Sequence, residues 1–411
     1  MTASSRASNW PAVADFAAAP TAADLDRWDE ADLAARPGRV ERLRARFDAS
    51  GVDAYFGVRR ENTRYITGFV LGEGEEKVAG HSGQFLVGRD QTVVLVDSRY
   101  TIQAAHEAIG TRIEDIGYDL PAAWPGLLAS LGARRVGIEA GFVSYAMWRR
   151  LEAADPAVEL VPVEGWIEQD RATKESSELE RVAAACSVAD RALATLLPKI
   201  RPGVTEAALA LDLEWLLRTG GAEAVAFDPT CLAGGRAALP HGSPSDALVR
   251  TGAVLLFDFG AQVAGYRSDM TRTLFVGEPA ERDLAVYELV AKSQAEAITN
   301  LEAALGAEVD LPSGRDLYTL AHGIVESDGR WPPFGHGLGH GIGLATHELP
   351  FLSRSASDDP LPSPTVFSVE PGIYLEGEVG VRIEDLILLD AGAGRVERLT
   401  QFPSDVIVVG A

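Results

Sequence analysis

Cysteine is nearly absent from this 411-residue sequence, which holds only Cys186 and Cys231. Two cysteines without C-x-x-C spacing cannot build a disulfide framework, so the sequence favours a reducing compartment. Long apolar runs are lacking too, since no stretch approaches the roughly 18 uninterrupted apolar residues of a membrane-spanning helix. The N-terminus has no basic region followed by an apolar run, which argues against a secretory signal. We therefore predict a cytoplasmic protein with no membrane partner.

Basic residues are scarce relative to acidic ones. The chain has 37 Lys and Arg against 60 Asp and Glu, a formal net charge of −23. Such a surplus repels a phosphate backbone, so no nucleic-acid partner is expected. A content of 46% hydrophobic and 24% charged residues is ordinary for a globular protein and excludes a disordered chain. At roughly 150 residues per domain, the length predicts two or three domains.

Composition and apolar periodicity divide the chain into three parts. Residues 1–38, rich in Ala, Ser, Asp and Pro, are expected to form a loosely attached N-terminal arm. Residues 39–166 alternate helical patterns with short apolar runs such as QFLVG and TVVLVD, which predicts an α/β domain. Residues 167–411 begin with a long helical pattern and continue with β ribbons interrupted by helices, which predicts an α+β domain. The acidic segment GEGEEK at 72–77 is expected to be a solvated loop, with a loop that enters a partner's active site as the alternative.

The first acidic pair lies in FDFGAQVAGYRSDMTRT and consists of Asp258 and Asp269. A hairpin centred on Val263 and Ala264 would place the two aspartates directly opposite each other. Directly opposed residues have Cβ atoms roughly 4.5–5.5 Å apart, and like charges there are destabilising unless something neutralises them. A divalent cation would do so. The alternative is a pair of surface aspartates on a ribbon with a slightly different turn.

The second acidic pair, Glu370 and Glu384, is symmetric about Gly377 in VEPGIYLEGEVGVRIED. A turn at residues 376–378 would make the two glutamates face each other across a ribbon. Pro371 favours an edge or bulged position beside Glu370, which leaves the register open. Glu384 also interrupts the otherwise apolar run VRIEDLILL, and burying it requires a charged partner.

Glycine occupies every second position from 335 to 343 in GHGLGHGIGLATHELP, a pattern that does not suit a helix. If the segment is extended, the even positions from His336 to Ile342 share one face, and the glycines let a neighbouring backbone come close. A flexible glycine loop with incidental histidines is the alternative. The candidate histidines of this half of the chain are His241, His336, His340 and His347.

One imidazole and four carboxylates form the candidate metal ligands: His340, Asp258, Asp269, Glu370 and Glu384. Oxygen-rich ligation with a single nitrogen suits Mn²⁺, Co²⁺, Fe²⁺ or Zn²⁺. Four carboxylates exceed what one ion needs. Two ions roughly 3.5–4 Å apart, sharing carboxylates and a bridging hydroxide, would balance the charge and create a nucleophile at neutral pH. The sequence therefore predicts a hydrolase with two divalent ions, for which Mn²⁺ is favoured while Co²⁺, Zn²⁺ and Fe²⁺ stay open.

These motifs, together with LPHGSPSD, SVEPGIY and VGVRIED, closely resemble those of the pita-bread metallopeptidases, specifically the aminopeptidase P and prolidase branch. NTRYITGF, LVDSRYTIQAA and RVGIEA are similar to the creatinase-type domain that precedes the catalytic domain in this branch. The resemblance covers nearly everything after residue 38. It implies an α/β creatinase-like domain at 39–166, an α+β pita-bread catalytic domain at 167–411, and a homodimer or dimer of dimers.

The resemblance also implies a role for each metal-ligand candidate. Asp258 would chelate one ion, and Asp269 and Glu384 would bridge both. His340 and Glu370 would bind the second ion, with Glu370 also shuttling a proton.

Four further residues match positions that the family uses around the substrate. His241 and His347 match histidines that contact the substrate and stabilise the tetrahedral intermediate. His336 matches a histidine that lines the substrate pocket, and Arg382 matches an arginine near the metal site. An imidazole donor aimed at a developing oxyanion strengthens in the transition state.

The expected reaction is hydrolysis of the amide bond before proline. The substrate would be either a peptide that loses its N-terminal residue or an Xaa-Pro dipeptide, and the motifs do not separate the two. Proline's amide lacks an N–H and has a fixed φ, so a dedicated pocket is physically sensible. Two alternatives stay open: a C–N hydrolase of a non-peptide amino-acid derivative on the same scaffold, and a non-catalytic binding scaffold.

Overall fold

The computed structural model describes residues 10–72, 82–307 and 310–410, so the expected acidic loop at 72–77 lies outside the described residues except for Gly72. The chain forms two compact units. One spans Asp26–Arg171, and the other combines Ala172–Ala411 with the residues before Asp26. Within the described ranges, no helix has the length and apolar character needed to cross a bilayer.

The N-terminal unit is built on a six-stranded sheet with strand order β4-β3-β2-β1-β5-β6. β2 pairs antiparallel with both β1 and β3, and the other pairs are parallel. The strands are β1 (Ala54–Gly57), β2 (Gln84–Gly88), β3 (Thr92–Val96), β4 (Arg112–Asp115), β5 (Arg135–Glu139) and β6 (Glu159–Val163). The helices are α1 (Ala22–Arg44), α2 (Phe47–Ser50), α3 (Arg60–Thr67), α4 (Thr101–Glu107), α5 (Leu120–Leu131), α6 (Tyr145–Ala154) and α7 (Trp166–Ala172).

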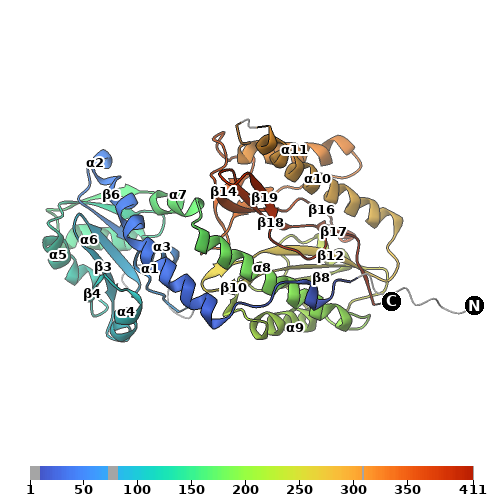
Figure 1. Cartoon of the computed structure of the whole chain (residues 1–411), viewed down its shortest axis with the longest axis horizontal. Coiled ribbons are helices and arrows are strands. Elements are labelled where there is room, and N and C mark those ends of the chain that lie inside the picture. The colour runs from blue at the N-terminus through green and yellow to red at the C-terminus, as the bar shows by residue number, and fades with distance from the viewer. Residues whose placement is uncertain (1–9, 73–81, 308–309, 411) are drawn as a thin grey trace, which may run out of the picture. The chain divides into compact units, whose positions relative to one another are not determined.

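Alternation along β3 shows how both faces of this sheet are covered. Val93 and Leu95 pack in the cluster that contains Trp124 of α5, whereas Val94 packs in a separate cluster with Ala104 of α4. Successive side chains of a strand point to opposite faces, so each face receives its own helices (Figure 1). This layered arrangement is the predicted α/β architecture.

Helix α1 runs through the expected boundary at residue 38. It begins at Ala22, and Trp28 is only 4% exposed on it. The alanines of this region are strong helix formers, so the composition that suggested a loose arm also suits a helix. The expected boundary at 166/167 falls at the start of α7, while the compact unit continues to Arg171.

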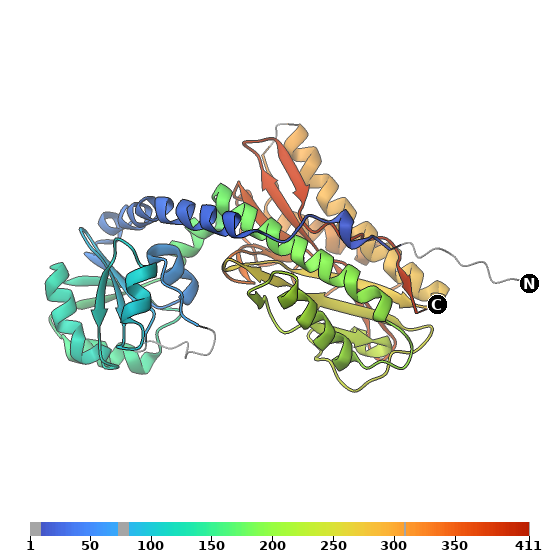
Figure 2. The same ribbon diagram turned by 60° about the horizontal axis from the view of Figure 1, so that its bottom comes forward.

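The stretch before α1 also differs from the loosely attached arm expected there. Trp10 donates its indole N–H to the carbonyl oxygen of Val408 at 3.0 Å, and the Phe16 ring stacks on Phe402 with centroids 6.2 Å apart. Figure 2 shows this stretch running beside helix α8 (Ser176–Leu196). Two aromatic side chains thus fix it to the C-terminal unit.

The C-terminal unit is an α+β structure with four longer helices. α8 and α9 (Glu206–Thr219) pack together, and α10 (Glu281–Gly306) packs with α11 (Gly314–Asp328). Figure 1 shows the strands between these two helix pairs. The strands are β7 (Ala224–Val225), β8 (Thr230–Ala233), β9 (Val254–Phe259), β10 (Ala261–Val263), β11 (Tyr266–Arg267), β12 (Met270–Val276), β13 (Gly339–Gly341), β14 (Glu348–Leu352), β15 (Thr365–Val369), β16 (Gly372–Leu375), β17 (Val379–Arg382), β18 (Asp385–Asp390), β19 (Arg395–Arg398) and β20 (Val408–Val409).

The first ribbon has a register two residues away from the predicted one. Asp258 pairs with Thr271, not with Asp269, so the predicted direct opposition of the two aspartates is wrong. The turn lies at Ala264 and Gly265, whose φ values are 46° and 83°. A two-residue hairpin turn with positive φ at both central positions suits glycine, whereas β-branched Val263 is poorly suited to it.

The second ribbon has the register symmetric about Gly377, which settles the choice that Pro371 left open. Gly372 pairs with Arg382 and Val369 with Asp385, so Glu370 and Glu384 fall at matching positions between the paired strands. The turn is centred on Gly377, whose φ is 71°.

The glycine run is extended only at β13. Leu338 belongs to the hydrophobic core, while His336 and His340 line a pocket, so the expected common face is not formed. A register shift follows His340, which breaks the alternation. The expected close backbone approach is present, because a Cβ on Gly339 would lie 1.8 Å from the Ser368 carbonyl oxygen.

Candidate metal centre

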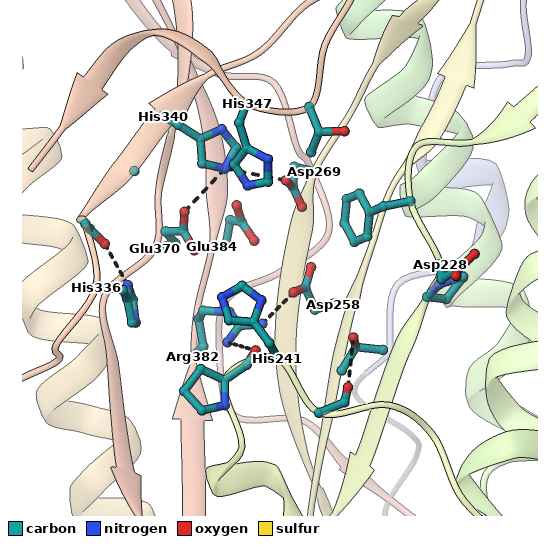
Figure 3. A pocket seen from close by; sticks show the side chains of 18 of the residues that line it. Asp228, His241, Asp258, Asp269, His336, His340, His347, Glu370, Arg382 and Glu384 are labelled. Carbon is teal, nitrogen blue, oxygen red and sulfur yellow. Dashed lines mark hydrogen bonds and ion pairs between the residues drawn. The ribbon is translucent and has the colours of Figure 1, made fainter. Parts of the chain in front are cut away.

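A cavity of about 680 Å³ in the C-terminal unit collects every residue singled out from the sequence. Figure 3 shows the carboxylates of Asp269, Glu370 and Glu384 gathered beneath two imidazole rings. The selected residues in its lining are His241, Asp258, Asp269, His336, His340, His347, Glu370, Arg382 and Glu384.

The two ribbons bring the acidic residues into this cavity from separate segments. Asp258 lies on β9, and Asp269 directly precedes β12, its pairing partner. Glu370 directly follows β15, and Glu384 directly precedes β18. Because β15 pairs with β18 in the register described above, the two glutamates leave the sheet side by side.

Asp269, His340 and Glu384 form a group in which one potential ligand atom from each residue lies within 4.8 Å of the others. His340 Nε2 is 3.7 Å from Asp269 Oδ2 and 3.4 Å from Glu370 Oε1. His340 Nδ1 lies 3.0 Å from the carbonyl oxygen of Gly341. A proton on Nδ1 leaves the Nε2 lone pair facing the carboxylates, which is the orientation that a metal-binding imidazole needs.

Asp258 faces the same cavity but is paired with an arginine. Its Oδ2 accepts a hydrogen bond from Arg382 at 2.5 Å. Arg382 is 3% exposed and also donates to Thr271 Oγ1 at 2.9 Å and to the Tyr374 hydroxyl at 3.0 Å. One carboxylate is therefore neutralised by the chain itself.

The remaining carboxylates destabilise one another. Burial is the main cause that raises the pKa of Asp269, Glu370 and Glu384, and the charge of Glu384 raises that of Asp269 further. Asp269 Oδ1 is buried and accepts no hydrogen bond within the described part of the chain. Buried charge of one sign needs a compensating charge or a metal ion. The donor set, with three carboxylates around one imidazole nitrogen, fits divalent cations.

The histidines around this cluster are held in distinct ways. The His347 and His340 rings are 4.2 Å apart between centroids. Burial and the neighbouring His340 lower the pKa of His347 to about 4, which keeps it neutral at pH 7. His336 Nε2 contacts the Tyr374 hydroxyl at 3.0 Å. His241 enters the same cavity on the side of Asp258 (Figure 3).

Three supporting residues were not identified from the sequence. Thr271 Oγ1 donates to Glu384 Oε2 at 2.7 Å, and Ser368 Oγ donates to Glu370 Oε1 at 3.2 Å. Thr271 lies two positions after Asp269, and Ser368 two before Glu370, so strand alternation could have found both. Tyr374, which bridges His336 and Arg382, carries no such signal.

Both units match models of known protein families. Residues 180–391 match the model of metallopeptidase family M24, and residues 39–173 match the creatinase/prolidase N-terminal domain. The chain belongs to metallopeptidase family M24. The M24 chain is 30% identical over 370 residues to the Xaa-Pro dipeptidase of Pyrococcus horikoshii, a match that covers 90% of this chain and 98% of that protein.

Solved structures similar to this M24 chain carry two kinds of name. An Xaa-Pro dipeptidase from Bacillus anthracis has a TM-score of 0.82 at 32% identity, covering 91% of this chain and 100% of that one. An X-Pro aminopeptidase from Thermotoga maritima has a TM-score of 0.79 at 33% identity, covering 90% and 99%. The predicted creatinase-type domain followed by a pita-bread catalytic domain is confirmed, and the protein is a metallopeptidase that uses divalent metal ions.

Proposed function

We propose that this M24 metallopeptidase hydrolyses the amide bond preceding proline with two divalent cations in the cavity. The observation that carries the proposal is the buried cluster of the Asp269, Glu370 and Glu384 carboxylates against His340, which we call the carboxylate cluster. Its support from relatives is the Xaa-Pro specificity in the names of an Xaa-Pro dipeptidase and an X-Pro aminopeptidase of similar fold. The substrate is a proline-containing peptide or dipeptide.

Asp258, Asp269, His340, Glu370 and Glu384 would hold the cations. When bound, such ions act as Lewis acids and lower the pKa of water enough to make it a nucleophile at neutral pH. Asp269 and Glu384 lie centrally and suit bridging positions. Glu370 accepts a hydrogen bond from Ser368 at 3.2 Å, which orients its carboxylate to move a proton between water and the leaving nitrogen.

The histidines would act on the substrate. His347 is neutral at pH 7 because its pKa is about 4, and its one ring N–H would donate a hydrogen bond to a developing oxyanion. His241 contacts the substrate from the opposite side of the cavity, and His336 lines the pocket. Arg382 holds Asp258 and thereby fixes one metal-ligand carboxylate.

Mn²⁺ is the proposed native ion, with Co²⁺, Zn²⁺ and Fe²⁺ as competitors for the same oxygen-rich ligands. We further propose that the enzyme works in the cytoplasm as a homodimer or dimer of dimers. Metal analysis of the purified protein tests the identity of the ion, sedimentation measurements test the oligomeric state, and cell fractionation tests the location.

A substrate panel tests the reaction itself. It contains Xaa-Pro dipeptides, Xaa-Pro-Xaa tripeptides and matched proline-free peptides, each assayed with Mn²⁺, Co²⁺ and Zn²⁺. Cleavage confined to bonds before proline supports the proposal, and the ratio of dipeptide to tripeptide rates assigns the substrate length. Equal cleavage of proline-free peptides would contradict it. Hydrolysis of a non-peptide amino-acid derivative with no peptide cleaved would favour the C–N hydrolase.

A further inference from the structure

The cavity loop that carries His241 is hydrogen-bonded at both ends to one buried side chain, that of Glu206. The loop connects β8 with β9, and its residues 240–244 line the cavity consecutively. Glu206, the first residue of α9, is fully buried with 0% of its surface exposed. It is not among the residues that line the cavity.

The Glu206 carboxylate accepts hydrogen bonds from both ends of the loop. The backbone N–H of Ala233 donates to Oε1 at 2.7 Å. At the far end, the backbone N–H and the hydroxyl of Ser245 donate to Oε2 at 3.0 and 2.8 Å. Between these ends, Arg236 Nε donates to both oxygens and its NH2 group donates to the Ser243 carbonyl oxygen at 2.7 Å. One carboxylate therefore closes the loop.

The main chain of α9 holds only one of the two ends. The Glu206 N–H donates to the Ala247 carbonyl oxygen, and the Ala207 N–H donates to that of Ser245, both at 3.0 Å. The helix N-terminus also favours a negative charge at this position, because its partial positive charge faces the carboxylate. At the Ala233 end, the hydrogen bond that joins the loop to α9 is made by the Glu206 side chain.

We propose that Glu206 is a positioning residue for the peptidase reaction, and that it acts by holding the loop 233–245 so that His241 faces the carboxylate cluster. The inference rests on the proposed function, in which His241 contacts the substrate. Among the described residues, the hydrogen-bond partners of the Glu206 carboxylate are Ala233, Arg236 and Ser245, none of which lines the cavity, so its effect must pass through the loop. Hydrogen bonds to a charged acceptor are stronger than neutral ones, which suits a carboxylate to this task.

Glu206→Gln is the informative substitution because it preserves size but removes the charge. Its amide offers one acceptor oxygen, so it cannot accept from both ends of the loop at once. We expect kcat/KM to fall about 10- to 100-fold, the range that small misplacements of catalytic groups produce. Glu206→Asp keeps the charge on a shorter side chain and should restore part of the loss.

A double-mutant cycle separates positioning from general destabilisation. If Glu206 acts through His241, the variant Glu206→Gln/His241→Ala is no less active than His241→Ala alone. Losses that multiply across the two substitutions would overturn the proposal. The matched control is Glu178→Gln on the first turn of α8, since Glu178 is also buried and accepts from a backbone N–H and the Tyr266 hydroxyl, neither on the loop.

Hydrogen exchange measured by mass spectrometry gives a readout that does not depend on turnover. In metal-loaded Glu206→Gln protein, peptides from 233–245 should exchange faster than in the wild type, while peptides from 339–348 keep their rates. The Glu178→Gln control should leave the loop peptides unchanged. Unaltered exchange of 233–245 in Glu206→Gln would overturn the inference. If the loop exchanges faster in Glu206→Gln but the wild type cleaves no peptide of the panel, the proposed function alone is contradicted.

Discussion

Glu139 of the N-terminal unit and the metal-centre carboxylates of Asp269 and Glu384 in the C-terminal unit are all buried, but their surroundings differ. In the N-terminal unit, Glu139 is 4% exposed and accepts hydrogen bonds from the backbone N–H groups of Val58 and Arg59 at 2.6 and 2.7 Å. It also accepts from the Tyr55 hydroxyl at 3.2 Å and from the Asn62 amide. In the metal centre of the C-terminal unit, the carboxylates of Asp269, Glu370 and Glu384 face one another (Figure 3).

The contrast teaches how to distinguish a structural buried charge from a binding one. Burial raises the pKa of Glu139 as it raises that of Asp269, so the direction of the shift does not separate them. Their partners do. Glu139 has a donor for each oxygen, whereas Asp269 keeps a buried oxygen without one among the described residues. A missing donor in a cavity points to a missing cation.

The largest expected effect comes from Glu384→Gln, which removes one charge from the cluster at constant shape. The amide cannot bridge two cations, so we expect bound metal to fall and kcat/KM to drop at least about 1,000-fold, or about 4 kcal/mol of transition-state stabilisation. Metal-free variant protein should also unfold at a higher temperature than metal-free wild type, because repulsion is relieved. Metal analysis, kinetics and thermal unfolding check the three outcomes.

Glu139→Ala should have the opposite signature. It removes the acceptor of the Tyr55 hydroxyl and of the Val58 and Arg59 backbone N–H groups, while the Asn62 amide keeps Glu168. Truncating a buried hydrogen-bonded charge costs about 3 kcal/mol or more of unfolding free energy. Hydrogen exchange in peptides from 54–67 measures this local loss, and metal content should not change. Loss of metal on Glu139→Ala would erase the distinction between the two kinds of buried carboxylate.

Asp190 tests an intermediate case, since burial raises its pKa to about 6 although the backbone N–H groups of Gln401 and Phe402 both donate to it at 2.9 Å. Its ordinary value is 3.8, so the folded protein binds this proton more tightly than the unfolded chain. The contribution to stability is complete below pH 3.8 and is lost as the pH rises through about 6. Between pH 4 and 7, wild type should lose about 2–3 kcal/mol more unfolding free energy than Asp190→Asn. Parallel pH dependences in denaturant titrations would contradict this.

The smallest effect is expected at a buried polar group that carries no charge, the hydroxyl of Tyr287. Tyr287 is 1% exposed and its hydroxyl donates to the carbonyl oxygens of Ser404 and Asp405 at 3.1 and 3.0 Å. Tyr287→Phe should cost about 1 kcal/mol of unfolding free energy, with kcat/KM unchanged. Denaturant unfolding followed by an activity assay checks both.

The sequence predicted which residues gather around the cavity more completely than it predicted the local geometry that brings them there. The register about Gly377 was predictable because one glycine marks the turn and the flanking residues are symmetric. The register about Ala264 was missed because two adjacent turns fit the same letters, and only the required positive φ values choose between them.

The glycine run shows what spacing alone leaves out. Its alternation predicted a common face for His340 and Leu338, but the strand covers only three residues and is followed by a register shift. That irregularity depends on contacts with strands distant in the sequence. The pairing of Asp258 with Arg382 and the link through Tyr374 likewise depend on distances that only the folded chain defines.

The backbone packing of the glycine run limits how this enzyme can be re-engineered. A methyl group on Gly339 would overlap the Ser368 carbonyl oxygen, and one on Gly341 would lie 2.1 Å from that of Leu349. Randomised libraries at these two positions should therefore yield almost no folded clones. Laboratory evolution of new substrate preferences would do better at Phe227 and Phe351, which line the cavity and already carry large side chains.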